Sequence, residues 1–133
     1  MKNQADENVE LVRRGYKAFN EGDMKTLSEL FDENAVWHSP GRTSLAGEYK
    51  GKENIFAQFG RYGGGTGGTF KAKLLHVLKD DNGHVVGIHH NSAERNGKKL
   101  DFMGSILFEI KDGKVIDGRE FGYDLYAWEE FWS

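Results

Sequence analysis

Three strong turn sequences divide the second half of this chain into long strand-like segments. They read DDNG at 80–83, RNGK at 95–98 and KDGK at 111–114. Asn-Gly and Asp-Gly pairs are the clearest local signals of a β-hairpin, because the tightest hairpin turns need residues with positive φ. The spacing of the turns therefore predicts a four-stranded antiparallel meander. Its strands are expected at residues 69–79, 84–95, 98–110 and 114–123.

The first half of the chain carries apolar residues at helical spacing instead, as in Val12, Tyr16 and Phe19. Asp23 and Asp124 are short polar residues of the kind that cap helices. The expected helices cover residues 5–20, a short stretch after Asp23, residues 52–62 and the C-terminal segment DLYAWEEFW. Three helices before a curved sheet and one short helix after it make an α+β fold. A length of 133 residues suits a single domain over 1–133.

Two segments between these elements carry recognisable patterns. ENAVWHS, which ends before Pro40, is strand-like and is followed by an expected loop over 41–51. The run GGGTGG at 63–68 matches the pattern G-x-G-x-x-G of dinucleotide sites. A phosphate site of that kind needs a strand before the glycines and a helix after them, whereas here a helix comes first. The run is therefore expected to be a flexible connector.

The overall composition argues against several classes of protein. The net charge is -3 and no basic cluster is interleaved with aromatics, so nucleic acid is not an expected partner. The lack of cysteine excludes disulfides and thiol chemistry. The five histidines show no metal-binding spacing, so no metal or other cofactor is expected. No apolar run approaches the roughly 20 residues that span a bilayer, and the N-terminus lacks a signal-like segment, so a cytoplasmic protein without membrane contact is expected.

The RNGK turn predicts the register of the two central strands. If residues 96–97 form a two-residue loop, Arg95 faces Lys98 and the residues further along pair in step. The expected pairs are Ala93 with Leu100, Asn91 with Phe102, His89 with Gly104, Gly87 with Ile106 and Val85 with Phe108. The even positions of the later strand are almost all apolar, so their face is expected to cover the core.

The KDGK turn allows two registers. A two-residue loop would turn inward Val115, Asp117, Arg119 and Phe121. A three-residue loop with a left-handed Gly113 would turn inward Ile116, Gly118, Glu120 and Gly122. The second register buries one charged group rather than two and is favoured, because an unpaired buried charge costs several kcal/mol. Pairing of Asp117 with Arg119 would make the first register acceptable.

The favoured register brings His89, Gly104 and Glu120 into one row across three strands of the core face. Several glycines on that face leave room for a cavity, although strong sheet curvature alone would also explain them. A carboxylate in an apolar cavity should have a raised pKa, which makes Glu120 the first candidate for acid–base chemistry. The alternative is a solvated edge residue. His89 is either a hydrogen-bonded wall or a proton-transfer partner.

The segment VWHSPG at 36–41 places a tryptophan beside a histidine on one strand. Neighbouring strand residues point to opposite faces, so Trp37 and His38 cannot both lie in the core. His38 is expected to face the cavity near His89 and Glu120, while Trp37 is expected on the outer side of the sheet.

Much of the chain resembles the SnoaL-like branch of the nuclear transport factor 2-like superfamily, whose relatives include ketosteroid isomerases, polyketide cyclases and limonene epoxide hydrolases. The matching stretches are LVRRGYKAFNEGDMKTLSELFDENAVWHSPG, LAGEYKGKENI, GKVIDGREF and DLYAWEEFWS. The resemblance implies a cone-shaped curved sheet, helices on its concave face and a homodimer through its outer face. Trp37, Met103 and Leu107 would supply an apolar patch on that outer face.

Site residues of these relatives carry over only in part. Arg119-Glu120 resembles the Arg-Asp pair of the epoxide hydrolase, and the acid–base aspartate of the cyclase maps near Glu120. The base aspartate of the isomerase falls at Ser39, and its oxyanion tyrosine at Gly15, one position short of Tyr16. The resemblance therefore favours Glu120 and does not imply steroid isomerisation.

The favoured function is a cofactor-independent acid–base enzyme, of isomerase, cyclase or hydrolase type, acting on a small apolar or aromatic organic molecule. Glu120 would transfer the proton, with His38 and His89 as relay or orienting groups. The residues expected to contact the substrate are Tyr16, Phe59, Asn91, Phe102 and Gly104. One alternative is a non-catalytic ligand-binding or accessory dimeric domain, in which the same groups only hydrogen-bond a ligand. Another is a dimeric scaffold whose cavity is filled by side chains.

Overall fold

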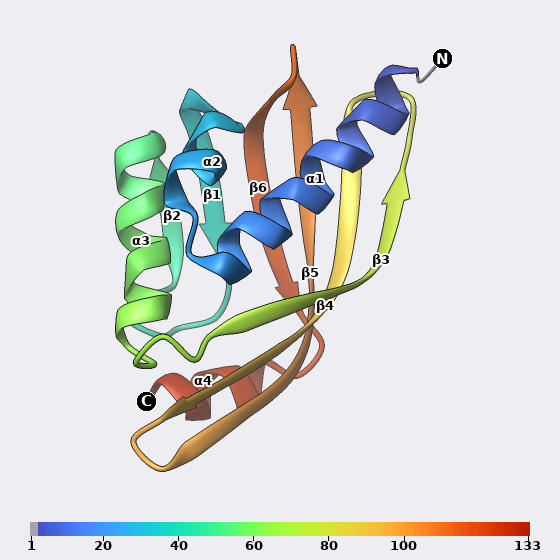
Figure 1. Ribbon diagram of the computed structural model, residues 1–133. Coiled ribbons are helices and arrows are strands. Elements are labelled where there is room, and N and C mark those ends of the chain that lie inside the picture. The colour runs from blue at the N-terminus through green and yellow to red at the C-terminus, as the bar shows by residue number, and fades with distance from the viewer. Residues whose placement is uncertain (1–2) are drawn as a thin grey trace.

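The computed structural model describes residues 3–133 and has an α+β fold (Figure 1). Its helices are α1 (Gln4–Glu21), α2 (Met24–Glu29), α3 (Lys52–Gly64) and α4 (Leu125–Trp132). Its strands are β1 (Phe31–Ser39), β2 (Gly47–Lys50), β3 (Lys71–Lys79), β4 (His84–Arg95), β5 (Lys98–Lys111) and β6 (Lys114–Gly122). The strands form one curved sheet in the order β2-β1-β6-β5-β4-β3, which confirms the predicted fold class.

The sheet extends beyond the predicted four-stranded meander on the β6 side. β1 lies beside β6 and runs parallel to it, whereas the other ladders of the described chain are antiparallel. β2 lies within the predicted loop 41–51, so that prediction is wrong for residues 47–50. Tyr49 of β2 pairs with Trp37 of β1. The result is a six-stranded mixed sheet in which β1 can contribute side chains to the same face as β6.

The β4–β5 hairpin has the predicted register. Residues 96–97 both have positive φ, at 50° and 77°, and form the two-residue loop. His89 lies opposite Gly104, as predicted. On its other side, however, Gly104 lies opposite Gly122 rather than Glu120. The predicted row of His89, Gly104 and Glu120 is therefore wrong by two positions on β6.

The β5–β6 hairpin corrects the predicted loop and keeps the predicted face for Glu120. Asp112 and Gly113, with φ of 51° and 75°, form a two-residue loop instead of a three-residue one. A β-bulge then shifts the register next to Val115. The extra residue of a bulge reverses the alternation of faces, so Val115 and Glu120 both point inward despite the odd spacing between them.

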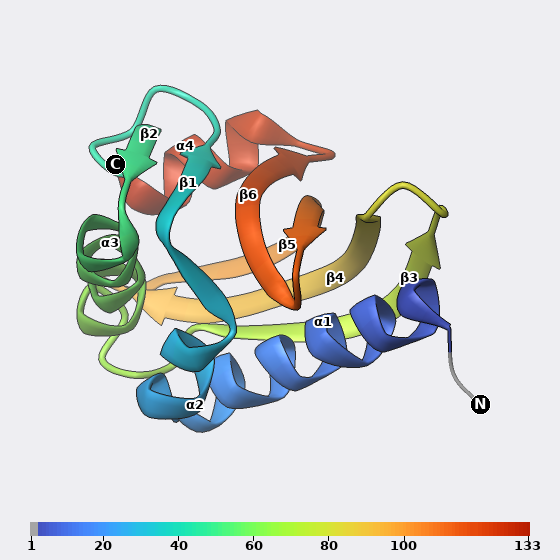
Figure 2. The same ribbon diagram turned by 90° about the horizontal axis from the view of Figure 1, so that it is seen from above.

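Helices cover the concave side of the curved sheet (Figure 2). α1 packs on β3 and β4, and α3 packs on β1 and β2. Gly22, with a φ of 71°, caps the C-terminal end of α1. α3 extends to Gly64, so the glycine run at 63–68 begins as helix and is not wholly a connector. No helix within residues 3–133 is both long and apolar enough to cross a membrane.

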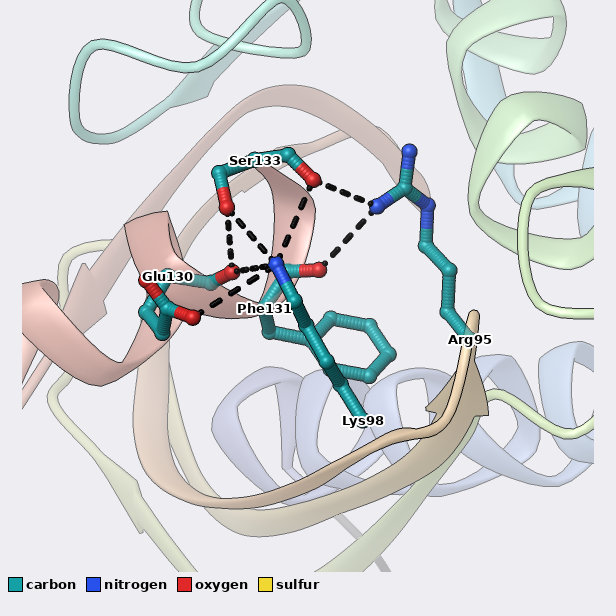
Figure 3. A network of polar contacts seen from close by, with 5 residues as sticks. All are labelled: Arg95, Lys98, Glu130, Phe131 and Ser133. Atoms are coloured by element: carbon teal, nitrogen blue, oxygen red, sulfur yellow. Dashed lines mark hydrogen bonds and ion pairs between the residues drawn. The ribbon is translucent and has the colours of Figure 1, made fainter.

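The tip of the β4–β5 hairpin holds the end of α4 (Figure 3). Arg95 Nη1 donates to the carbonyl oxygens of Phe131 and Ser133, at 3.2 and 3.0 Å. Lys98 Nζ donates to the carbonyl oxygen of Glu130 at 2.8 Å. These cations lie at the C-terminal end of the helix, where carbonyl groups lack partners within the helix and the helix dipole favours positive charge. The contacts fix α4 against β5 at one end of the sheet.

The outer face of the sheet carries part of the predicted apolar patch. Met103 is 42% exposed there and Leu107 is half-buried. Trp37 is only 3% exposed and belongs to the core, so its predicted outer position is wrong. Homodimerisation through the outer face stays a prediction. Sedimentation equilibrium would test it, and a monomer at every protein concentration would contradict it.

Candidate active site

A cavity lies between the helices and the concave face of the sheet. The volume that the centres of water molecules can occupy in it is about 70 Å³. One water needs roughly 10–15 Å³ by this measure, so several waters or a compact organic group would fit. Most lining side chains are aromatic or aliphatic. The ionisable side chains that line it are Tyr16, Tyr62, His89 and Glu120.

Glu120 has one carboxyl oxygen held by the protein and the other left open. Its Oε2 accepts hydrogen bonds from Trp37 Nε1 at 2.6 Å and Ser39 Oγ at 3.2 Å. The Tyr62 hydroxyl donates a third, also at 3.2 Å. No residue of the described chain donates to Oε1. The carboxyl group is therefore fixed in one orientation, with Oε1 available to a ligand.

The surroundings of Glu120 change its affinity for protons. Burial among the aromatic walls raises the pKa of its carboxyl group above the usual value, while the hydrogen bonds from Trp37, Tyr62 and Ser39 act in the opposite direction. The side chain still keeps some accessible surface, because it lines the cavity. A carboxyl group with a raised pKa and an open oxygen can both take and release a proton during a reaction.

Tyr16 and His89 form a neutral pair on the cavity wall. The Tyr16 hydroxyl lies 2.6 Å from His89 Nδ1. Desolvation lowers the pKa of His89 to about 4, against the opposing effect of a hydrogen bond with Asn91. Desolvation, and then the charge of Glu120, raise the pKa of Tyr16 far above its usual value. Both rings are therefore uncharged at neutral pH, so they offer hydrogen bonding without charge.

The cavity brings together five of the eight predicted site residues. They are Tyr16, Phe59, His89, Asn91 and Glu120. His38 is not among them, and its predicted place in the cavity is wrong. It points to the outer face, where its Nε2 lies 2.9 Å from Asp117 Oδ1. The pleat explains the error, because Trp37 takes the inward position next to it.

Phe102 and Gly104, two predicted substrate contacts, do not line the cavity. Phe102 packs under α4, with its ring centroid 4.9 Å from that of Trp128. Gly104 lies beneath the His89 ring, where an added Cβ would come within 2.9 Å of Nε2. Both residues support the walls of the site rather than its interior.

The glycines on the inner face make room for rings. The nearest atoms to an added Cβ would be those of Tyr16 at Gly87 (2.8 Å), His89 at Gly104 (2.9 Å), Trp37 at Gly118 (2.2 Å) and Phe102 at Gly122 (2.3 Å). Such distances are well inside van der Waals contact, so each ring requires the glycine beneath it. The predicted link between these glycines and free space for a ligand is therefore wrong, since rings of the protein fill that space.

A family model described as a SnoaL-like domain matches residues 12–118. This chain belongs to the SnoaL-like family. An uncharacterised protein of Mycobacterium tuberculosis (strain ATCC 25618 / H37Rv) is 34% identical over 128 residues, which cover 96% of this chain and 98% of the relative. The structure of Bal32a from a soil-derived mobile gene cassette is 70% identical, with a TM-score of 0.97 over 98% of this chain and 100% of that one. A putative SnoaL-like polyketide cyclase from Jannaschia sp. CCS1 shares the fold, with a TM-score of 0.81 at 20% identity over 100% and 96% of the two chains. The predicted resemblance is thus confirmed.

Sequence reasoning misses four residues of this SnoaL-like site: Trp37, Ser39, Gln58 and Tyr62. Weak signals for them exist. Ser39 lies two positions from Trp37 on a strand and so shares its face. Gln58 and Tyr62 lie four positions apart on α3 and so share one face of the helix. No local pattern indicates that this face of β1 and this face of α3 meet at Glu120. The reason is that the pairing of β1 with β6 joins segments about 80 residues apart.

Gly118→Ala is expected to destabilise the SnoaL-like fold by about 1–3 kcal/mol, the usual cost of overpacking a core. The new Cβ would lie 2.2 Å from the Trp37 ring, which must then shift from its position over β6. Urea unfolding measures the loss. Gly60→Ala is the matched control, since no atom outside its own helix lies within 4 Å of its Cβ position and alanine favours helix. Equal stability of the two variants would contradict the role assigned to Gly118.

The stability of the protein is expected to fall on acidification because of His89. Its pKa is about 4 in the folded protein, against 6.5 for a histidine surrounded by water, as in the unfolded chain. Between these pH values the unfolded state binds the extra proton, so stability falls as pH drops from 6.5 towards 4, by about 3 kcal/mol in all. Urea unfolding above pH 6.5 and near pH 4 measures this difference.

Comparison with His89→Gln isolates this contribution. Glu120 has the opposite effect on the pH dependence of stability. Its carboxyl group has a higher pKa in the folded protein than in the unfolded chain, so its contribution to stability is lost as the pH rises past the unfolded pKa. His89→Gln should therefore show a smaller acid-induced loss than the wild type. His76→Gln, which changes an exposed histidine on β3, should keep the full loss. The same pH dependence in His89→Gln and the wild type would contradict the assignment.

Proposed function

We propose that this SnoaL-like protein is a cofactor-independent acid–base enzyme that transfers protons on a small, neutral, mostly apolar organic molecule. The observation that supports this most is the arrangement of Glu120. Its Oε2 is held by three donors, and its Oε1 has no partner within residues 3–133. A fixed carboxyl group with one open oxygen in an apolar cavity meets the geometric need of general acid–base catalysis.

The charges of the cavity wall support a neutral substrate. Neither lysine nor arginine is among the described residues that line the cavity. His89 is uncharged at neutral pH, since its pKa is lowered to about 4. A carboxylate or phosphate would therefore lose its hydration shell without gaining a counter-ion, and it would also approach the Glu120 carboxyl group. The aromatic walls suit a flat or ring-shaped apolar molecule instead.

The simplest reaction of this kind is proton transfer next to a carbonyl group. Oε1 of the ionised Glu120 takes a proton from the substrate carbon next to the carbonyl group. The C–H electron pair moves into the new enolate, and the negative charge rests on the substrate oxygen. Return of the proton from Glu120 to the same or another carbon completes the cycle. The Tyr16–His89 pair is suited to hold the substrate oxygen, because it offers a hydrogen bond without a competing charge.

Deuterium exchange tests the proposal. Neutral cyclic ketones are incubated with the whole chain in D₂O, and the loss of their α-proton signals is followed by NMR. We expect exchange above the buffer rate with ketones that bind, and none with matched cyclic carboxylates. Binding in the cavity without faster exchange would overturn the enzyme proposal in favour of the non-catalytic ligand-binding domain. Failure of the whole panel to bind would overturn it as well.

A further inference from the structure

Gln58 lies behind the residues that hold Glu120 and contacts two of them. The side chain is almost fully buried, with 1% of its surface exposed. Its amide nitrogen Nε2 lies 2.8 Å from Ser39 Oγ and 2.9 Å from the Tyr62 hydroxyl oxygen. The same nitrogen lies 3.2 Å from the carbonyl oxygen of Leu45. Three acceptors therefore surround one NH₂ group.

The Leu45 carbonyl determines which end of the amide faces the hydroxyl groups. A carbonyl oxygen only accepts, so the amide must present nitrogen to Leu45; the reverse orientation would bring two acceptor oxygens together. The Leu45 oxygen already accepts a hydrogen bond from the Tyr49 hydroxyl at 2.9 Å. The two hydrogens of Gln58 Nε2 are therefore donated to its two nearer acceptors, the hydroxyl oxygens of Ser39 and Tyr62.

This orientation decides where the hydroxyl protons point. An amide NH₂ group cannot accept a hydrogen bond, so neither Ser39 nor Tyr62 can donate back to Gln58. Each hydroxyl oxygen accepts from Gln58 and keeps its single proton for another acceptor. Glu120 Oε2 is that acceptor, at 3.2 Å from both hydroxyl oxygens.

We infer that Gln58 is a positioning residue, which directs the hydroxyl protons of Ser39 and Tyr62 onto Glu120 and so makes its carboxyl group release a proton more readily. The opposite end of the amide supports this reading. Gln58 Oε1 is buried without a hydrogen-bond partner among the described residues. Since a buried unpaired oxygen is unfavourable, the contacts made by the nitrogen must outweigh it. The functional meaning of the inference rests on the proposed acid–base role of Glu120.

Other titratable groups near Glu120 come from the remaining cavity walls. They are Tyr62 on α3, Tyr16 on α1 and His89 on β4. Burial raises the pKa of both tyrosines and lowers that of His89 to about 4, so all three groups are uncharged at neutral pH, and none of them is removed when Gln58 is replaced. If replacing Gln58 changes the titration of Glu120, the change therefore reflects where the hydroxyl protons of Ser39 and Tyr62 point.

Gln58→Met tests the inference, with the Glu120 carboxyl carbon followed by ¹³C NMR over a pH series in the whole chain. Methionine keeps the length and burial of the side chain and removes both donors. Ser39 and Tyr62, 3.4 Å apart, are then free to donate to one another. We expect a roughly tenfold smaller acid dissociation constant for Glu120, as for the loss of a hydrogen bond to a charged group. Gln58→Glu should lower the constant further, because its carboxylate would draw both hydroxyl protons away.

Two comparisons keep the test decisive. Asn8→Leu also removes a buried amide, one that bonds Gln4 instead of the site, and should leave the titration of Glu120 unchanged. In a Ser39→Ala, Tyr62→Phe background, Gln58→Met should have no further effect. An unchanged titration of Glu120 in folded Gln58→Met would overturn the inference. If that variant does not fold, an unchanged titration in both Ser39→Ala and Tyr62→Phe would overturn it. These outcomes concern the free protein, so they are separate from a failure of catalysis in the exchange assay.

Discussion

Glu120→Gln is expected to slow ketone deuterium exchange by about 10²- to 10⁴-fold, the usual contribution of a general base. Glutamine has the shape of glutamate and its amide oxygen can still accept the hydrogen bond that Trp37 donates at 2.6 Å. It cannot take a proton from carbon, so ligand binding should survive while exchange is lost. The exchange rate at saturating ketone and the dissociation constant of the ketone, both from NMR, separate these two effects.

Asp117→Asn is the matched control for this experiment. Asp117 lies on the same strand as Glu120 but on the outer face, where its Oδ1 lies 2.9 Å from His38 Nε2. Its replacement should leave the exchange rate within about twofold of the wild type, since a surface charge so placed adds little to the cavity. Exchange by Glu120→Gln at the wild-type rate would contradict the role of Glu120.

Trp128→Ala is expected to destabilise the protein by about 3–5 kcal/mol, the range for removing a large buried aromatic side chain. The Trp128 ring is 2% exposed and fastens α4 to the body of the fold. Its centroid lies 4.9 Å from that of Phe102 on β5 and 5.8 Å from that of Tyr62 on α3. Its indole nitrogen has no hydrogen-bond partner in the described chain, so the loss would come from packing alone. Urea unfolding at neutral pH measures it.

Tyr126→Ala on the same helix provides the comparison. Tyr126 is 88% exposed, so its removal should change the free energy of unfolding by no more than about 0.5 kcal/mol. A loss of stability no greater in Trp128→Ala than in Tyr126→Ala would contradict the anchoring role of Trp128.

The sheet could be predicted largely because its hairpins are local. Residues 96–97 specify a tight turn by themselves, and the pairing of β4 with β5 follows from that turn alone. The position of β1 cannot be predicted in this way. Its parallel pairing with β6 joins Trp37 to Gly118, and no turn connects the two strands.

The error at Trp37 has a physical cause that the sequence alone does not reveal. Of the pair Trp37 and His38, the polar histidine is the more obvious partner for a buried carboxylate. The indole ring instead buries more apolar surface and still offers one N–H, which satisfies Glu120. Gly118 makes this possible, because only a residue without Cβ fits beneath the ring. A glycine on a core face is thus a signal for a neighbouring ring rather than for empty space.

Glu120 faces inward as predicted, but not because of the predicted loop. The β5–β6 turn is a two-residue loop instead of the three-residue loop expected, and the β-bulge near Val115 turns Glu120 to the same face. Bulges depend on how a whole strand packs, which no short sequence pattern specifies. The resemblance at Arg119-Glu120 supports the same conclusion independently of the loop.

Titration of the Glu120 carboxyl carbon by ¹³C NMR in the wild-type protein tests the central claim most directly. A proton-transferring carboxyl group in the cavity should titrate above 4.5, the ordinary pKa of glutamate, and its pKa should change when a neutral ketone binds. A pKa at or below 4.5 that no ketone changes would describe a solvated surface residue and would contradict the proposed function.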